Sequence, residues 1–364
     1  MEQMEMSNEN LKNMKEMEST KNCLLDRIKG SLIGGAIGDA LGYPVEFESR
    51  NWIIKKHGEK GITRFETNAR WRNGEKHGNK AIVSDDTQMT LFTAVGLVDA
   101  KKQNIPLIDG IRHAYVDWYM TQMGGKSVYG SWIADIEELN VERAPGITCM
   151  SAMSVISSGL EAHNNSKGCG GVMRVAPIGL YAALGNMTIE EADRLAGQAA
   201  RLTHQHPLGY LPAALMSHVI YRLATDMAPT QEKMKGYVQD GIAMLRKEYV
   251  ECAKDVEYMA ELAELAMELV DNGRSDADNV ARLGEGWTGE EALAIGLYCA
   301  MQHFDSFEKA MIAAVNHSGD SDSTGSVAGN ILGAAIGYDA LPSFYKDDVE
   351  LHDVITQIAE QMAM

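Results

Sequence analysis

Apolar residues recur at helical intervals along most of the chain, and the alternation typical of β-strands is scarce. The clearest example is AKDVEYMAELAELAMELVDNG, residues 253–273, where one helix face would carry Val256, Met259, Leu262, Leu265 and Leu269. The pattern ends near Gly273, and glycine often closes a helix. The chain has only 8 prolines and 6 phenylalanines but 22 methionines. The sequence therefore predicts an all-α fold.

Two helix starts and one irregular segment can also be predicted. Thr188 stands three residues before Glu191, which is the spacing of a capping box, and a periodic helical segment follows. Asp305 and Glu308 have the same spacing before SFEKAMIAAV. Residues 51–82 contain scattered glycine, lysine and tryptophan without a period, so we expect a loop there.

Two segments near opposite ends of the chain carry glycine at every fourth residue. They comprise Gly30, Gly34, Gly38 and Gly42, and Gly325, Gly329, Gly333 and Gly337. Glycine inside a helix costs about 1 kcal/mol relative to alanine, so these rows need a compensating contact. We expect the two helices to cross with their backbones in close contact. Membrane helices use the same device, but Asp39 and Asn330 make these poor membrane segments.

Two short acidic clusters, SDDT at 84–87 and DSDS at 320–323, combine carboxylates with hydroxyls. Alone, the first is typical of a helix cap, and the second is typical of a polar loop that leads into a helix of small residues. If the clusters converge, their mutual repulsion would have to be relieved by protonation or by cations. Oxygen ligands favour magnesium, manganese or calcium over zinc. An EF-hand is excluded, because Ile331 occupies the position of its glutamate ligand.

Composition narrows the class of protein. The 364 residues show no linker after about residue 25, so one domain over 23–364 is expected, with two domains as the alternative. The net charge of −18 argues against nucleic-acid binding. Five cysteines without a C-x-x-C pair predict reduced thiols in a cytoplasmic protein. No apolar run reaches the length of a membrane span.

Six ordered segments between residues 24 and 340 resemble the ADP-ribosylglycohydrolase family, which includes dinitrogenase reductase-activating glycohydrolases and ADP-ribosylarginine hydrolases. They are GSLIGGAIGDALGYPVE, SDDTQMT, KGCGGVMRVAPIGL, LTHQHPLGY, GEGWTGEEALAIGLYCA and SGDSDSTGSVAGNILGAAIG. The resemblance implies a single compact all-α domain with two magnesium or manganese ions in a central cleft. The implied metal ligands are Ser84, Asp85, Asp86, Asp320, Asp322 and Ser323.

The resemblance also implies catalytic and ligand-binding residues. Asp85, Asp86 and Asp322 would be catalytic, and Glu46 stands where serine-linkage members carry a catalytic glutamate, although a surface glutamate is the alternative. The residues expected to line an ADP-ribose site are Gly168, Gly170, Gly171, Met173, Arg174, His204, Gly286 and Trp287. Backbone N–H groups of the glycine-rich turn could cradle a diphosphate. Core packing is an alternative for Trp287, and a zinc site at His204 and His206 is not favoured.

The implied activity is hydrolysis of mono-ADP-ribosylated protein side chains, most of all arginine, with release of ADP-ribose. Alternatives are a serine or small-molecule linkage, a two-metal phosphoesterase, and a non-catalytic binder of ADP-ribose or toxin. Residues 1–22 precede the resemblance. They predict either a solvated, partly disordered tail or a helix whose methionines dock on a partner, such as an ADP-ribosyltransferase toxin in an immunity role.

Overall fold

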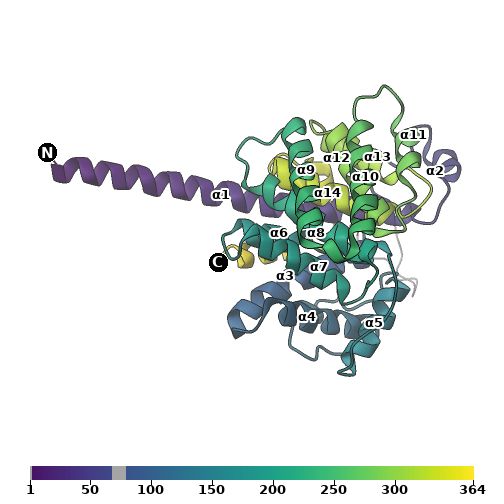
Figure 1. The fold of residues 1–364 in the computed structure, drawn as a ribbon, viewed down its shortest axis with the longest axis horizontal. Helices are drawn as coiled ribbons and strands as arrows, with labels where there is room; N and C mark the ends of the chain where they lie inside the picture. The colour runs from purple at the N-terminus through teal and green to yellow at the C-terminus, as the bar shows by residue number, and fades with distance from the viewer. Residues whose placement is uncertain (1, 68–78) are drawn as a thin grey trace.

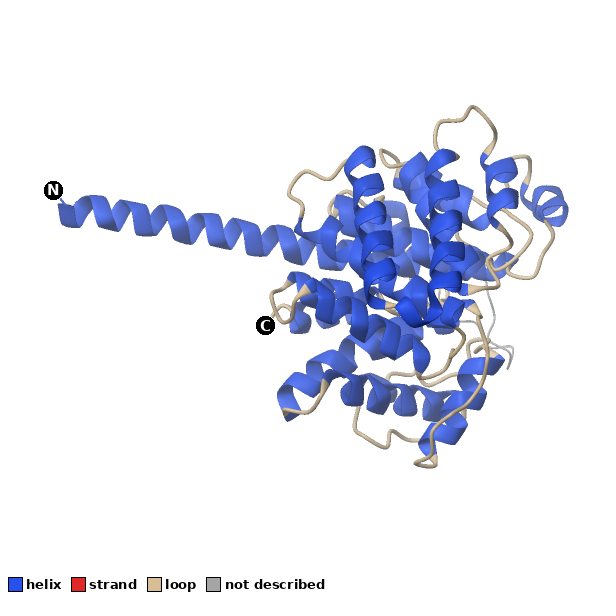
Figure 2. Cartoon of the chain, in the orientation of Figure 1, coloured by secondary structure: helices blue, strands red, loops and turns tan. Residues whose placement is uncertain are grey.

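The structure is a computed structural model that describes residues 2–67 and 79–364, with side chains described from residue 20 onward. Helices and loops make up these residues, and none of them forms a named strand (Figure 2). Two isolated bridges, between Ala81 and Val349 and between Gly168 and Thr288, are the β-type pairings recorded there. The prediction of an all-α fold is confirmed.

Sixteen α-helices and four short 3₁₀ turns are present in the described part of the chain, with the longest connections before α3, α5 and α6. The first half of the chain forms α1 (Glu2–Gly42), α2 (Arg50–His57), α3 (Asp85–Gln103), α4 (Leu107–Gln122), α5 (Ile147–Ser157), α6 (Ala176–Ala183), α7 (Ile189–Arg201) and α8 (Pro207–Thr225). The second half forms α9 (Gln231–Glu248), α10 (Ala253–Glu268), α11 (Asp276–Leu283), α12 (Gly289–Gln302), α13 (Phe307–Val315), α14 (Ser321–Ile336), α15 (Ser343–Lys346) and α16 (His352–Met362). Short 3₁₀ turns are η1 (Tyr43–Val45), η2 (Trp132–Asp135), η3 (Cys169–Gly171) and η4 (Val250–Cys252).

Helices α1 and α14 lie side by side in the middle of the molecule, although they are far apart in the sequence (Figure 1). Their glycines meet as three antiparallel pairs, Gly30 with Gly333, Gly34 with Gly329 and Gly38 with Gly325. A Cβ atom on Gly34 would lie 2.5 Å from the carbonyl oxygen of Gly329, so no larger side chain fits without separating the helices. The predicted close crossing is therefore present.

Gly42 and Gly337, the last glycines of the two rows, lie at opposite ends of this contact, and Gly337 also lies against Gly30. Gly42 lies against the backbone of Ser321, and Gly337 lies against the Asp26 side chain. Gly337 also has a positive φ of 82° as the residue that closes α14. The end of α1 is therefore held directly beside the start of α14, where the second acidic cluster lies.

The other helices surround this central pair. Helix α14 also packs against α12 and α13, α3 packs against α4, and α7 packs against α8 (Figure 1). The flanking helices bury alanine, leucine, valine and methionine in one continuous apolar core. This packing leaves the N-termini of α3 and α14 near the end of α1.

The local predictions were correct in part. Thr188 and Glu191 form the predicted capping box of α7. The cap of α13 is Ser306 and not Asp305, because the Ser306 hydroxyl accepts the hydrogen bond from the backbone of Lys309.

Two predicted boundaries were wrong. Helix α10 ends at Glu268, and Gly273 lies in the turn that follows. The predicted loop over 51–82 contains α2, which the sequence did not reveal because only Ile53 of that helix is buried. Residues 68–78 of that predicted loop lie outside the described part of the chain.

Helix α1 runs without a break across the predicted boundary between residues 22 and 23. Its N-terminal part projects away from the rest of the molecule (Figure 1). The extension is therefore helical in this structure, and whether it docks on a partner stays a prediction. Among the described residues, no helix combines the length and the apolar character that crossing a membrane requires.

The glycine pairs predict a large difference between two glycine-to-alanine variants. Gly38→Ala should destabilise the protein by about 1–3 kcal/mol or more, because the methyl group collides with the backbone of Gly325. Gly236→Ala is the matched control, since Gly236 lies inside α9 with open space where its Cβ would be. That variant should gain about 0.5–1 kcal/mol from helix propensity. Urea unfolding measures both, and equal stability of the two variants would contradict the close helix contact.

Candidate active site

The first acidic cluster opens helix α3. Ser84 is the N-cap, and its hydroxyl accepts a hydrogen bond of 3.2 Å from the backbone N–H of Asp86. Asp39, from α1, accepts hydrogen bonds from the backbone N–H groups of Ser84 at 2.9 Å and Thr87 at 3.0 Å. The Thr87 hydroxyl also donates to Asp39. A buried carboxylate of α1 thus fixes the start of α3, while the two cluster aspartates stay in its first turn.

The two aspartates of this cluster are buried but differ in their partners. The backbone N–H of Asp85 donates a hydrogen bond to the carbonyl of Arg143. The side-chain Oδ2 of Asp85 accepts a hydrogen bond of 3.3 Å from the N–H of Gly146. Asp86 is 3% exposed, and its Oδ2 has no hydrogen-bond partner among the residues that the structure describes. A buried carboxylate oxygen without a partner is costly, which indicates that something outside the described atoms binds it.

The second cluster opens helix α14. Asp320 is the N-cap, and its Oδ1 accepts from the N–H of Ser323 at 3.3 Å. Asp322 Oδ1 accepts from the same N–H at 3.0 Å. The Thr324 hydroxyl, by contrast, donates to the carbonyls of Ala314 and Asp320, so it belongs to the framework. The cap geometry therefore gathers both aspartates at one helix end.

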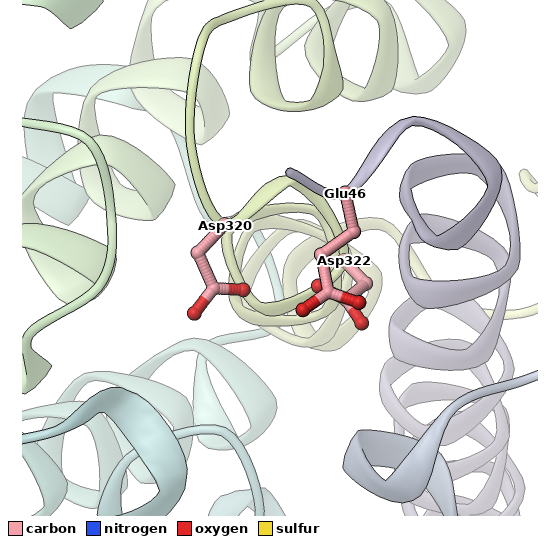
Figure 3. A group of neighbouring side chains, drawn as sticks. All are labelled: Glu46, Asp320 and Asp322. Atoms are coloured by element: carbon pink, nitrogen blue, oxygen red, sulfur yellow. The ribbon is translucent and has the colours of Figure 1, made fainter. Parts of the chain in front are cut away.

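Glu46 joins this second cluster. Its backbone N–H donates to Gly42 at the end of α1, and its side chain is half-buried. Carboxylate oxygens of Glu46, Asp320 and Asp322 lie within 4.8 Å of one another, and Figure 3 shows the three side chains converging. This placement is not that of an isolated surface glutamate.

The carboxyl groups of the site have raised pKa values, so they lose their protons at higher pH than usual. Burial raises the pKa of Asp85 to about 8, with charges on Asp39 and Asp320 adding to the effect. Burial, then the charges of Asp320 and Asp85, raises the pKa of Glu46 to about 9.

The charges of each cluster also raise the pKa values of carboxyl groups in the other cluster. Burial raises the pKa of Asp86 well above its usual range, and the charges of Asp85, Asp39 and Asp320 act in the same direction. Burial and the charges of Glu46, Asp320 and Asp86 do the same for Asp322. The Asp86 carboxylate is also hydrogen-bonded to the Ser323 side chain, so the two clusters lie near each other. That they bind the same ions stays a prediction.

This group of oxygens fits divalent cations. Buried carboxylates that repel one another can be stabilised by cations, and Asp86 Oδ2 is left without a hydrogen bond. The donors are carboxylates and hydroxyls, which suit magnesium or manganese. The expected ligand set thus lies at the adjoining starts of α3 and α14.

The glycine-rich turn lies beside the second cluster, but not as a free phosphate cradle. The N–H of Gly168 donates to the Ser166 hydroxyl, and the N–H of Cys169 donates to the carbonyl of Trp287. A Cβ on Gly170 would collide with His204, and one on Gly171 would collide with the backbone of Gly209. These glycines are thus required for close packing, and two N–H groups of the turn are already used.

Two residues expected to bind ADP-ribose, Arg174 and His204, belong to the framework of the described structure. Arg174 is 0% exposed and donates to the carbonyl of Ala199 and the hydroxyl of Thr203. The Thr203 hydroxyl in turn pairs with Nδ1 of His204 at 2.9 Å, and burial lowers the pKa of His204 to about 3. Met173 is also buried, but its Sδ lies 4.0 Å from the Ser323 hydroxyl oxygen, beside the second cluster. The prediction that Arg174 contacts the ligand is wrong, because its guanidinium has no access to solvent.

His206 does not join His204 in a metal site. It is the N-cap of α8, and its Nδ1 accepts from the N–H of Leu208.

An aromatic pair lies next to the acidic group. Trp287 is half-buried, and its ring stacks on Phe47 with centroids 5.0 Å apart. Phe47 follows Glu46, has a positive φ of 66° and is 72% exposed. Gly286, also with positive φ, lies against Asp320 and Thr324. Trp287 is therefore a surface aromatic beside the cluster and not a core residue.

Sequence reasoning missed Asp39, Phe47 and Cys169. Asp39 stands inside a row of small residues, and a lone carboxylate in a buried helix is a signal that could have revealed it. The thiol of Cys169 donates to Asp320 Oδ2 at 2.8 Å, and no sequence pattern indicates this contact.

Several known proteins are similar to this chain. The ADP-ribosyl-[dinitrogen reductase] glycohydrolase of Rhodospirillum rubrum is 25% identical over 330 residues, 90% of this chain and 91% of that protein. Human ADP-ribosylhydrolase ARH3 is 25% identical over 214 residues, 54% of this chain and 58% of that protein. ADP-ribosylarginine hydrolase Tri1 of Serratia proteamaculans is 23% identical, covering 93% of this chain and 79% of that protein.

A solved structure described as an ADP-ribosylglycohydrolase-related protein complex has the same fold. It superposes with a TM-score of 0.64 at 20% identity, covering 93% of this chain and 98% of that one. The family model for ADP-ribosylglycohydrolase matches residues 20–364, which is nearly the whole chain. With the acidic clusters at the starts of α3 and α14, this match shows that the chain belongs to the ADP-ribosylglycohydrolase family.

Proposed function

We propose that this protein is a cytoplasmic, metal-dependent hydrolase that removes ADP-ribose from arginine side chains of modified proteins. The observation that carries the proposal is that two buried acidic clusters lie close enough to raise each other's pKa values, while the carboxylates of Glu46, Asp320 and Asp322 are grouped together. Five free cysteines agree with a reducing compartment.

The metal site would comprise the residues of the two clusters that offer oxygen donors. These are Ser84, Asp85, Asp86, Asp320, Asp322 and Ser323. Two magnesium or manganese ions held there would orient the ribose hydroxyls and lower the pKa of an attacking water. All six positions carry donor side chains, which argues for catalysis over the role of a non-catalytic ADP-ribose binder.

The chain's own residues support the remaining steps. A carboxylate of the cluster, Asp85, Asp86 or Asp322, would accept the proton of the attacking water. The negative field would stabilise an oxocarbenium-like transition state and favour a cationic guanidinium leaving group. Phe47 and Trp287 provide an aromatic surface next to the site for the apolar faces of the substrate.

One observation favours a second linkage. Glu46 lies among the cluster carboxylates, and its raised pKa of about 9 keeps it protonated near neutral pH in the metal-free protein. A protonated carboxyl can serve as a general acid for an alkoxide leaving group, as hydrolysis of a serine linkage requires. Serine-linked ADP-ribose is therefore the second candidate substrate.

Removing the charge of one cluster carboxylate should lower the enzymatic activity and raise the stability of the metal-free protein. Asp322→Asn should lower ADP-ribose release by more than the roughly 10–100-fold that loss of a metal's outer-shell partner costs. The metal-free variant should nevertheless melt at a higher temperature than the wild type, because repulsion is relieved. Asp305→Asn, which removes an exposed charge, is the matched control and should change neither quantity.

The same cluster predicts how stability depends on pH. The pKa of Asp85 rises from 3.8 to about 8 on folding, so its contribution is full below about pH 4 and is lost as pH rises through 8. The melting temperature of the metal-free protein should fall over that range, and Mn²⁺ should reverse the fall. Full activity after exhaustive chelation would rule out the metal-dependent mechanism.

The linkage can be decided with matched peptides. Arginine-, serine- and glutamate-linked ADP-ribosyl peptides are incubated with the enzyme, and free ADP-ribose and phosphate are followed by mass spectrometry. We expect the arginine linkage to be cleaved fastest, and Glu46→Gln to lose less activity than Asp86→Asn.

Glu48→Gln, two residues from Glu46, controls for a changed charge near the site. Faster cleavage of the serine linkage, together with an inactive Glu46→Gln, would assign the enzyme to the second candidate. Release of phosphate in place of ADP-ribose would indicate a phosphoesterase.

We also propose that the N-terminal part of α1 binds a partner of the enzyme, with an ADP-ribosyltransferase as the first candidate. The family match begins at residue 20, and the helix projects beyond the compact part of the molecule (Figure 1). Such an arm could hold a toxin while the site repairs its targets, which would be an immunity function. Deletion of residues 1–22 should weaken binding to an arginine-specific transferase and leave hydrolysis of peptides unchanged. Loss of hydrolysis in the truncated protein would show that the segment belongs to the core.

A further inference from the structure

The thiol of Cys169 lies among the oxygens of the second acidic cluster. Its S–H group donates to Oδ2 of Asp320 at 2.8 Å, and its Sγ is 3.6 Å from the hydroxyl oxygen of Ser323. Both neighbours belong to the expected metal ligands. The sulfur is therefore placed where a further ligand of the same ion would be.

These spacings match those of atoms that share one metal ion. Metal–oxygen bonds of about 2.1 Å and metal–sulfur bonds of about 2.3 Å at right angles place oxygen and sulfur roughly 3.1 Å apart. The distances from Sγ to Asp320 and to Ser323 lie on either side of this value. Small rotations of the side chains would bring both distances to the value expected for two ligands of one ion.

A second observation at the same place points to a missing ligand. Asp86, from the other cluster, is 3% exposed, and no described residue forms a hydrogen bond with its Oδ2. It is close enough that its charge, after burial and the charge of Asp320, raises the pKa of the Cys169 thiol. The Ser323 side chain contacts both groups, since its hydroxyl lies 3.6 Å from Sγ and it is hydrogen-bonded to the Asp86 carboxylate. The open carboxylate oxygen of Asp86 and the thiol therefore lie near one another at one place.

The backbone holds the sulfur in this position. The N–H of Cys169 donates to the carbonyl of Trp287, and Gly168 forms a bridge with Thr288. Gly170 packs against His204, which leaves η3 no room to shift in that direction. Such pre-organisation is expected of a metal ligand, because ordering the side chain then costs little free energy when the ion binds.

We propose that Cys169 is a metal ligand, which with Asp86, Asp320 and Ser323 binds one divalent ion and makes this centre prefer a transition-metal ion over Mg²⁺. A thiolate is a soft donor that Mg²⁺ binds poorly, whereas cobalt, iron and zinc bind it well. On binding, the thiol proton passes to solvent and the sulfur exchanges its hydrogen bond to Asp320 for the metal bond. This inference rests on the proposed metal dependence of the enzyme.

Cobalt binding tests the proposal without any activity measurement. Chelated, metal-free protein is titrated with Co²⁺, and the near-ultraviolet spectrum is recorded for the sulfur-to-cobalt charge-transfer band. The wild type should show the band at saturation, and Cys169→Ser should lack it. Serine retains a donor for Asp320, so the variant keeps the hydrogen bond that supports the fold. Cys149→Ser and Cys252→Ser are the matched controls and should keep the band.

Competition between ions gives a second readout. The ratio of the Co²⁺ affinity to the Mg²⁺ affinity, from calorimetry, should fall about tenfold or more in Cys169→Ser, because a hard oxygen replaces the sulfur. An unchanged ratio, or Co²⁺ binding to the wild type without the charge-transfer band, would show that the thiol only orients Asp320. Absence of binding by any divalent ion would overturn this proposal and the metal-dependent function together.

Discussion

The contact between the backbones of α1 and α14 is the constraint on which the rest of the structure depends. Three glycine pairs let the two helices approach until no Cβ atom fits between them. The same helix α1 carries Asp39, which binds the N-terminus of α3 through Ser84 and Thr87. One helix therefore fixes the relative positions of both acidic clusters, and a small separation of α1 from α14 would move them apart.

The electrostatic cost of this arrangement explains its chemistry. Asp85, Asp86, Asp322 and Glu46 have raised pKa values because they are buried and repel one another. A protein that buries so many carboxylates together loses stability unless protons or cations compensate. The energy that helix packing contributes thus maintains a site that is unfavourable when empty and favourable to divalent ions.

The sequence predicted what depends on local spacing. The capping box at Thr188, the glycine rows and the two acidic clusters could all be read from intervals of three or four residues. Prediction from the sequence failed where tertiary contacts decide the position of a side chain. Arg174 follows a glycine-rich turn, as a ligand-binding arginine could, but the fold buries it under that turn. Cys169 reaches Asp320 only because η3 packs beside α14, and nothing in its sequence neighbourhood indicates that contact.

The central claim is that the adjoining starts of α3 and α14 form one divalent-metal centre. The most direct test is a crystal structure of the protein grown with Mn²⁺, with diffraction data collected near the manganese absorption edge. We predict anomalous-difference peaks within bonding distance of Asp86 on α3 and Asp322 on α14. Crystals of fully loaded protein without anomalous density between these two residues would contradict the account.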